Sequence, residues 1–418
     1  MDQSYFKVVH NFYMVLHGGV LLWFDQEYAY AGCPNDNVKI GTKKTSIGIM
    51  KVGILTLPLG HNYGGILQAW ALQQTLKALG YDVVLLHRKH KVSLSENFNL
   101  FLRRLYAKWI KKKAGVEIFR CEKNVTIKNT TRFINRNFRI VTTNDSYKKV
   151  IDDLDAIIVG SDQVWRPIYA DGHLDDFFLK FTEGKKLKRI GYAASFGVDY
   201  PEYDSDEKSM ASALLKNFDA VSVREKSGLT LCSNMLGFAN AELMPDPTLL
   251  LDIDDYRQIY KKCECPDYFT KLFAYILDPN DNTREIVDKI SGAMDQKPFT
   301  VHSKIDDLKA PLIERIHPPL EHWLLAIANS DFIITDSFHG CVFSIIFNKD
   351  FIVLGNKERG MARISSLLRQ FNLFHRLIES AACIEDIRSL HPINWSDVNG
   401  TRCSLAKKGI FFLRKNIN

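Results

Sequence analysis

A histidine that could do chemistry follows an apolar run near the end of the chain, in the stretch IITDSFHG. The apolar residues before Asp336 predict a strand, so Ser337, Phe338 and His339 should follow its carboxyl end. His339 would then begin a helix, where free backbone N–H groups favour an anion. Its imidazole can bind phosphate or act as a general acid or base. The alternative is a ring satisfied by a neighbouring carbonyl group.

An arginine takes a similar position after another strand-like run, AVSV. The planar guanidinium of Arg224 suits a phosphate or a carboxylate. The alternative for this residue is an ion pair with Glu225 or Asp246. Arg359 and Arg363 follow the run FIVL and would add positive potential if that strand neighbours IITD.

Three further strand-like runs are each followed by polar side chains or glycines. These residues are Asn62, Tyr63, Gly64 and Gly65 after the first run, Ser161, Asp162, Gln163 and Trp165 after the second, and Ser195 after the third. The two glycines open a predicted helix, where free N–H groups would favour an anion. Close packing of the helix is the alternative explanation for them.

Patterns typical of other kinds of site are missing from the sequence. It contains no G-x-G-x-x-G, no P-loop, no H-E-x-x-H and no G-x-S-x-G motif. The carboxylates lack the spacing of calcium or zinc ligands. We therefore expect neither a metal nor a cofactor.

The candidate residues can meet only if their strands share a sheet edge. The run KVGILTLPLG, the helical pattern GGILQAWALQQTLKALG and the run YDVVLLHR form one βαβ unit. Strands and helices continue to alternate as far as DFIVLG. The sequence therefore predicts an α/β protein with two doubly wound, Rossmann-like domains.

Changes in pattern along the chain predict the domain boundaries. We expect an extension outside the core at 1–49, an N-terminal domain at 50–215 with a basic helical insertion at 95–148, a C-terminal domain at 216–375, and a helical tail at 376–418. The insertion shows no strand pattern. Residues 103–113 within it have the composition of a basic amphipathic helix that could contact anionic lipid. A solvated helix face is the simpler alternative.

The overall composition excludes several classes of protein. Hydrophobic residues make up 46% and charged residues 25% of the 418 positions, which excludes disordered and collagen-like chains. The net charge of +7 is too small to select among anionic small molecules, membranes and nucleic acids. Eight scattered cysteines indicate reduced thiols in a cytosolic protein. No run reaches the roughly 20 apolar residues of a spanning helix.

Six motifs occur in a fixed order: NYGGILQAWALQ, IIVGSDQVW, YAASFG, SVREKSG, DPTLLL and ITDSFHG. Together they resemble the polysaccharide pyruvyl transferase family, from about Met50 to Leu373. The resemblance implies a glycosyltransferase-B-like fold in which the N-terminal domain holds a sugar acceptor and the C-terminal domain holds phosphoenolpyruvate. It implies transfer of the pyruvyl group to two hydroxyls of one hexose, which forms a cyclic ketal and releases phosphate.

The resemblance also assigns roles to residues of this chain. The donor-binding arginine and histidine of the family match Arg224 and His339. The family has an arginine two positions before the histidine, where this chain has Ser337, and Arg359 or Arg363 would replace it.

Phosphoenolpyruvate carries a carboxylate and a phosphate, and its C3 must receive a proton, which a general acid accelerates. We expect His339 to contact the phosphate or donate that proton, and Asp162 to act as a base for the acceptor hydroxyl. The remaining substrate-binding residues are expected to be Ser337, Phe338, Gly340, Arg359 and Arg363 beside Arg224, with Asn62, Tyr63, Gly64, Ser161, Gln163, Trp165 and Ser195 on the acceptor side. Trp165 would stack on a sugar ring, and a core position is its alternative.

Two other functions are compatible with the same residues. A glycosyltransferase using a nucleotide sugar would need a ribose-binding carboxylate, for which Glu358 is the candidate. A non-catalytic glycan-binding relative is the other, and Ser337 is the argument for it. We expect no nucleic-acid partner, a cytoplasmic location, and contact with the inner face of the membrane only through 103–113. The sequence specifies neither the hexose nor the oligomeric state.

Overall fold

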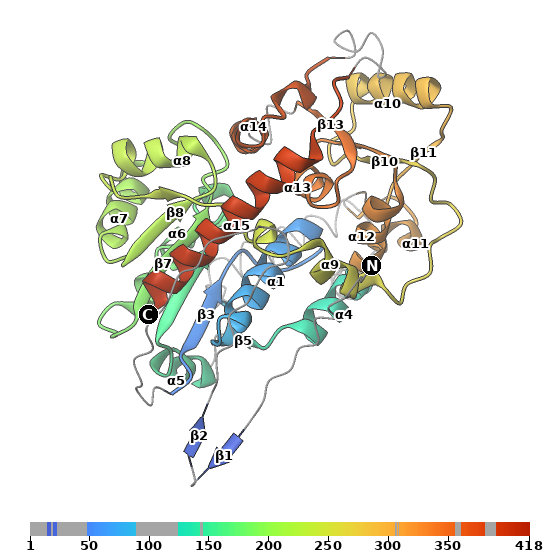
Figure 1. Ribbon diagram of the computed structural model, residues 1–418. Coiled ribbons are helices and arrows are strands. Elements are labelled where there is room, and N and C mark those ends of the chain that lie inside the picture. Colours follow the sequence, from blue (N-terminus) through green and yellow to red (C-terminus); the bar gives the residue numbers. More distant parts are fainter. Residues whose placement is uncertain are drawn as a thin grey trace, which may run out of the picture. The chain divides into compact units, whose positions relative to one another are not determined.

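The computed structural model describes residues 15–17, 20–22, 48–88, 124–142, 145–305, 307, 309–355, 361–380 and 390–418 (Figure 1). Contacts divide the chain into two units, Met1–Ile47 and Gly48–Asn418. In the first unit, β1 (Val15–His17) and β2 (Val20–Leu22) form an antiparallel pair. Three predictions, the basic helix at 103–113, the role of Arg359 and the candidate carboxylate Glu358, fall outside the described residues.

The first large sheet has seven parallel strands in the order β5-β4-β3-β6-β7-β8-β9. The strands are β3 (Lys51–Leu55), β4 (Asp82–His87), β5 (Ile140–Thr142), β6 (Ala156–Gly160), β7 (Lys188–Ala194), β8 (Ala220–Val223) and β9 (Glu242–Leu243). Both β3 and β6 are almost wholly buried, as their continuous apolar runs predict. The chain order reverses beside β3, as in a Rossmann fold.

Helices connect these strands and cover the sheet. The first, α1 (Tyr63–Ala78), links β3 to β4 and is buried over most of its length, because apolar residues surround it on nearly all sides. The others are α4 (Lys128–Asn137), α5 (Asp145–Asp152), α6 (Leu174–Phe177), α7 (Ser205–Leu215) and α8 (Lys226–Thr230).

The second large sheet has five parallel strands in the order β11-β10-β12-β13-β14. They are β10 (Leu272–Tyr275), β11 (Pro298–Phe299), β12 (Phe332–Thr335), β13 (Asp350–Leu354) and β14 (Leu377–Ile378). The helices of this part are α9 (Ile253–Tyr260), α10 (Asp281–Met294), α11 (Leu312–Arg315), α12 (Leu320–Asn329), α13 (Phe338–Ile346) and α14 (Met361–Gln370). No helix within the described ranges has the length and apolar character needed to cross a bilayer.

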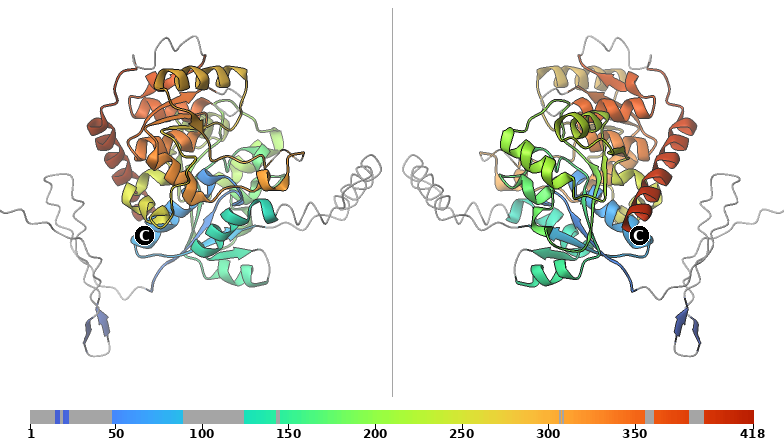
Figure 2. Two further views of the ribbon diagram at one scale, coloured as in Figure 1. Left: turned by 90° about the vertical axis from the view of Figure 1, so that its right-hand side faces the viewer. Right: turned by 90° about the vertical axis from the view of Figure 1, so that its left-hand side faces the viewer.

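The last helix, α15 (Trp395–Ile417), packs against the first sheet although it follows the second in sequence. The ammonium group of Lys408 donates to the carbonyl of Leu243, at the end of β9. The hydroxyl of Tyr81 donates to the side chain of Asn418, and Figure 2 shows this end of the red helix beside the blue segment of residues 48–88. The helix therefore holds the C-terminal end of the chain against the domain that contains the seven-stranded sheet, which we call the first domain.

One apolar core contains residues from both large sheets. Trp70 of α1 lies 5.7 Å from Tyr256 of α9, and Tyr256 lies 4.9 Å from Phe343 of α13, measured between ring centroids. These aromatic contacts hold α13 beside α1. The first turn of α13 therefore lies near the carboxyl ends of strands in the first sheet.

Two parallel α/β sheets confirm the prediction of two Rossmann-like domains, but the boundary at 215/216 is wrong. Strands β8 and β9 pair within the first sheet, so that sheet extends to Leu243 and the second begins at Leu272. An apolar run has the same pattern whichever sheet it joins. The expectation that 95–148 holds no strand is also wrong, since the half-buried β5 forms an edge of the first sheet.

Candidate active site

Each large sheet has a point where the chain order reverses, and the candidate residues gather there. In the first sheet the reversal lies between β3 and β6, and in the second between β10 and β12. Loops after neighbouring strands diverge at such points and leave room for a ligand. Asn62 follows β3, Ser161 follows β6, and His339 follows β12.

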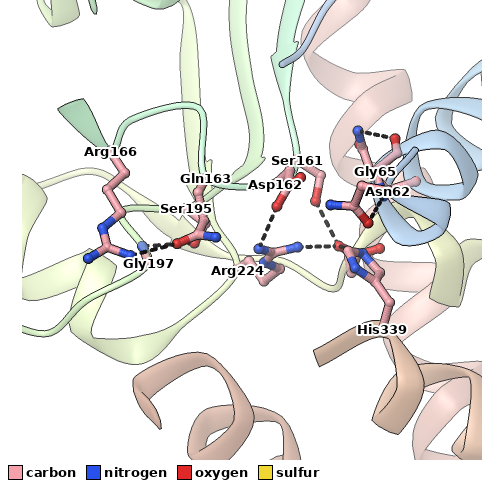
Figure 3. A network of polar contacts seen from close by, with 12 residues as sticks. Asn62, Gly65, Ser161, Asp162, Gln163, Arg166, Ser195, Gly197, Arg224 and His339 are labelled. Carbon is pink, nitrogen blue, oxygen red and sulfur yellow. Dashed lines mark hydrogen bonds and ion pairs between the residues drawn. The ribbon is translucent and has the colours of Figure 1, made fainter. Parts of the chain in front are cut away.

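Arg224 lies at the centre of the cluster (Figure 3) and forms a buried ion pair with Asp246. Nη1 of Arg224 donates to Oδ2 of Asp246 over 2.7 Å, and both side chains are almost completely buried. The Ser161 hydroxyl donates to the same oxygen at 2.8 Å. The backbone N–H and the hydroxyl of Thr248 donate to the other oxygen. Asp246 therefore fixes the guanidinium of Arg224 at the end of β8.

These contacts also set the ionisation of Asp246. Burial acts to raise the pKa of its carboxyl, but His339, Arg224 and the Thr248 hydroxyl outweigh burial and hold that pKa well below its usual range. The carboxylate therefore stays charged at neutral pH.

His339 approaches this pair from the second sheet. It lies in the first turn of α13, whose N-cap Ser337 accepts a hydrogen bond from Gly340 N–H at 3.3 Å. Nε2 of His339 lies 3.6 Å from Oδ2 of Asp246, a separation that allows an ion pair with a protonated ring but is too long for a hydrogen bond. On its other side, the buried ring packs against the backbone of Gly64.

The loop before His339 is held by the neighbouring strand end. The Asp336 carboxylate accepts hydrogen bonds from the backbone N–H groups of Leu277 and Asp278, at 2.7 and 2.9 Å. Asp336 thus ties the end of β12 to the end of β10. This contact sets the direction in which α13 begins.

Asp162 completes the first-sheet side of the cluster. Its Oδ1 lies 3.6 Å from Nη2 of Arg224, and the residue is buried. Its backbone has a φ of 62°, in the left-handed region that costs energy for a residue other than glycine. Backbone strain of this kind concentrates at functional sites.

A second arginine, Arg363, lies beside the same aromatic ring as Arg224. The guanidinium carbon atoms of Arg224 and Arg363 lie 4.3 and 5.8 Å from the ring centroid of Phe338. Burial and the charge of Arg224 lower the pKa of Arg363 to about 10. Two cations are therefore held close together at low exposure, which a ligand with two negative groups would stabilise.

Glu225 supports the loop between Arg224 and Ser195. Its Oε1 accepts hydrogen bonds from the Ser195 hydroxyl at 3.0 Å and from Phe196 N–H at 2.9 Å. Burial raises the pKa of this carboxyl, although Arg224, Arg363 and the two hydrogen bonds oppose that rise. Ser195 thus helps to shape the loop after β7, and its hydroxyl is already engaged.

Three nitrogen atoms in the cluster have no hydrogen-bond acceptor among the described residues. They are Nε and Nη2 of Arg224 and Nε2 of His339. Buried donors are nearly always paired, and leaving one unpaired costs about 1–3 kcal/mol. The arrangement thus lacks an acceptor-rich partner, and an anion would supply one.

The cluster is nearly closed to solvent. Asp162, Arg224, His339 and Arg363 are all buried. Two hollows in the described surface lie elsewhere, one beside Thr56 and His87 and the other beside residues 183–185.

Two residues predicted to face the acceptor are core residues, so these predictions are wrong. Trp165 is fully buried, stacks on Phe178 with ring centroids 5.3 Å apart, and donates to the Phe177 carbonyl. Tyr63 is also fully buried, and its hydroxyl donates to the Pro318 carbonyl. Both side chains are large and apolar enough for a core, which was the stated alternative for Trp165 but was not considered for Tyr63.

Three other predicted residues cap a helix or allow close packing. Asn62 is exposed and caps α1 by accepting from Gly65 N–H at 3.1 Å. Gly64 and Gly340 are sites of close packing, against His339 and Thr335 respectively. At both glycines, the structure shows close packing and not an open anion site.

The prominent role of Asp246 was not predicted. The sequence suggested it only as an alternative partner for Arg224, and Glu225 likewise. Asp246 stands between two prolines after β9, in the motif DPTLLL. A carboxylate at a rigid strand end was the available signal. Within the described ranges, no three His, Cys, Asp or Glu side chains are placed to share a metal ion.

The fold and the cluster together define a class: a chain with two Rossmann-like sheets whose strand ends surround a buried arginine, histidine and carboxylate group. Comparison with family models identifies the particular family. The model for polysaccharide pyruvyl transferase matches residues 62–358, which is more than half of the chain. The chain belongs to the polysaccharide pyruvyl transferase family.

Solved structures with similar folds share little sequence with this chain. UGT89C1 of Arabidopsis thaliana complexed with UDP-L-rhamnose is 8% identical, over 88% of this chain and 98% of that one, with a TM-score of 0.47. UDP-N-acetylglucosamine 2-epimerase of Rickettsia bellii is 12% identical, over 88% and 97%, with a TM-score of 0.46. Anabaena HepE in complex with UDP-glucose is 10% identical, over 88% and 100%, with a TM-score of 0.46. A search of curated proteins found no match.

Proposed function

We propose that this chain transfers the pyruvyl group of phosphoenolpyruvate to a hexose, forming a cyclic ketal and releasing phosphate. The observation that carries the proposal is the group of buried nitrogen atoms on Arg224 and His339 that make no hydrogen bond to the described residues, beside the second cation Arg363. Phosphoenolpyruvate has a carboxylate and a phosphate, and each can accept several charge-assisted hydrogen bonds. The family match supports the same donor.

In this reaction a proton adds to C3 of phosphoenolpyruvate, and one hydroxyl oxygen of the hexose bonds to C2. The bond from C2 to the phosphate oxygen then breaks, and phosphate leaves with the bonding electrons. The second hydroxyl oxygen bonds to C2 and closes the ring. The two hydroxyl protons balance the proton gained at C3 and the proton taken up by phosphate.

We assign His339 to the phosphate contact or to protonation of C3, with Arg224 and Arg363 holding the anionic groups. Arg363 would take the place of the arginine that family members have where this chain has Ser337. A donor anion bound to Nη2 of Arg224 would displace the carboxylate of Asp162, which lies 3.6 Å from that nitrogen. Asp162 would then be free to accept a proton from the hexose hydroxyl.

We also propose an acceptor that is a polysaccharide or a lipid-linked repeat unit, and a cytoplasmic place of reaction. Five cysteines in the described part of the chain are free thiols, which is compatible with a reducing compartment.

Thermal unfolding with candidate donors tests the proposal. Phosphoenolpyruvate at 100 times its Kd should stabilise the protein by about 2.7 kcal/mol. We expect the melting temperature to rise with phosphoenolpyruvate, and this rise to be lost in His339→Ala. A matched control is His322→Ala, which removes a half-buried histidine from α12. Stabilisation by UDP- or GDP-sugars instead would contradict the proposal and identify a glycosyltransferase.

A further inference from the structure

Three large apolar side chains are exposed next to the polar cluster. Ile168 and Tyr169 lie in the 3-10 helix η1 (Pro167–Tyr169), after β6, and Tyr200 follows β7. Their exposed fractions are 72%, 43% and 55%. Single exposed apolar residues are ordinary, but a group beside a polar site is typical of a ligand surface.

A fixed ion pair connects the two tyrosines. Arg166 is buried, and its Nε and Nη2 donate to the two carboxylate oxygens of Glu202 at 2.8 and 2.9 Å. The hydroxyl of Tyr200 lies 3.4 Å from Oε1 of Glu202, as a donor. The ring centroid of Tyr169 lies 5.6 Å from the guanidinium carbon of Arg166. A bidentate pair of this kind limits the movement of both partners.

The tyrosines are also continuous with the candidate active site. Nη1 of Arg166 donates to Oε1 of Gln163 at 3.3 Å, and Gln163 directly follows Asp162 (Figure 3). Gly197 makes room for this contact, since a Cβ atom there would lie 2.9 Å from Cδ of Arg166. The surface formed by Tyr169 and Tyr200 is thus connected, through Arg166, to the residue that follows the proposed base Asp162.

A hexose matches the chemistry of this surface. A pyranose ring has an apolar face of C–H groups and a rim of hydroxyls. A tyrosine ring is a rigid, amphipathic surface that loses little conformational entropy on binding. The charged oxygens and nitrogens of Glu202 and Arg166 can pair with the hydroxyl rim.

We propose that Tyr169 and Tyr200 form the stacking platform for the acceptor hexose, with Arg166 and Glu202 oriented toward its hydroxyls. This inference rests on the proposed function and names the place of its second substrate. The platform takes the role that the sequence suggested for Trp165. It presents the hexose to Asp162 from the first-sheet side, opposite His339.

Titration with methyl glycosides of glucose, galactose and mannose, followed by saturation-transfer NMR, tests the platform. We expect Tyr169→Ala and Tyr200→Ala each to raise the Kd of the bound glycoside about tenfold. Tyr169→Phe and Tyr200→Phe keep the ring and should bind within about twofold of wild type. Tyr268→Ala is the matched control, because Tyr268 is 54% exposed and contacts Phe269 and Phe299 instead.

The outcomes separate this proposal from the assignment of the donor. Unchanged Kd values in both alanine variants would overturn the platform even if phosphoenolpyruvate stabilises the protein. Failure of the wild-type chain to bind any of the three glycosides at about 10 mM would overturn it as well. Tyrosine-dependent glycoside binding without stabilisation by phosphoenolpyruvate would support the platform and reject the pyruvyl donor.

Discussion

At Gly64 the backbone of α1 approaches His339 so closely that no side chain fits between them. A Cβ atom added there would meet the imidazole ring directly and would lie 2.7 Å from the Cβ atom of His339. At the next position, a Cβ atom would find ordinary contacts, 3.4 Å from Asn62 and 3.5 Å from Asp162. The two adjacent glycines therefore differ sharply in what they allow.

We predict that Gly64→Ala displaces His339 from Asp246, abolishes stabilisation by phosphoenolpyruvate, and lowers the free energy of unfolding by about 1–3 kcal/mol. Gly65→Ala should keep the donor response. Thermal unfolding of both variants with and without phosphoenolpyruvate measures this difference. An equal donor response in the two variants would show that the position of His339 does not control donor binding.

At the scale of elements, α15 shows that a helix can pack against a domain whose sequence lies far from its own. Gly409 lies where the helix meets the first domain, and a Cβ atom there would lie 2.6 Å from Leu250 and closer still to the Tyr192 hydroxyl. Gly400, in the same helix, has no atom within 4 Å of such a Cβ atom. The helix therefore carries one glycine required by packing and one that is not.

We predict opposite effects for the two glycines of α15. Gly409→Ala should lower the free energy of unfolding by about 1–3 kcal/mol through overpacking. Gly400→Ala should raise it by about 0.5–1 kcal/mol, because alanine favours a helix. Urea denaturation followed by circular dichroism compares them. Stabilisation by both substitutions would mean that α15 does not pack on the first domain as described.

At the scale of the whole molecule, buried charges link folding to pH. Asp246 binds Arg224 in the first sheet and faces His339 of the second. The pKa of Asp246 in the folded protein lies well below the unfolded value of about 3.9. A carboxyl group with a lowered pKa stabilises the folded state fully above the unfolded pKa. That contribution is lost as the pH falls toward the folded pKa.

We predict that the unfolding free energy of the wild-type chain falls as the pH drops below about 4, partly through Asp246. Asp246→Asn should be about 3–5 kcal/mol less stable at pH 7, because it leaves Arg224 buried without its counterion. It should also show a shallower decline below pH 4. Urea denaturation between pH 7 and 3 measures both effects, with the exposed Asp281→Asn as control. Identical acid dependence in Asp246→Asn and wild type would contradict this assignment.

The sequence was sufficient for much of the fold because strands and helices are encoded locally. Apolar runs predicted β3, β4, β6, β7, β8 and β12, and a helical pattern predicted α1. The boundary at 215/216 was wrong because a strand's own pattern does not specify its partner. The edge strand β5 is three residues long and only half-buried, so it carries little periodic signal.

The same distinction holds at the site. The positions of Arg224 and His339 after strand ends, and their family resemblance, followed from the local sequence and the order of its motifs. The pairing of Arg224 with Asp246, the approach of His339 to Gly64 and the burial of Trp165 did not. The ion pair joins residues that follow β8 and β9, and Trp165 is buried against Phe178 and Phe196. The packing of α1, α9 and α13 brings His339 beside Gly64. Only the tertiary structure decides such contacts, because the spacing of residues along the chain does not specify which side chains meet across a core.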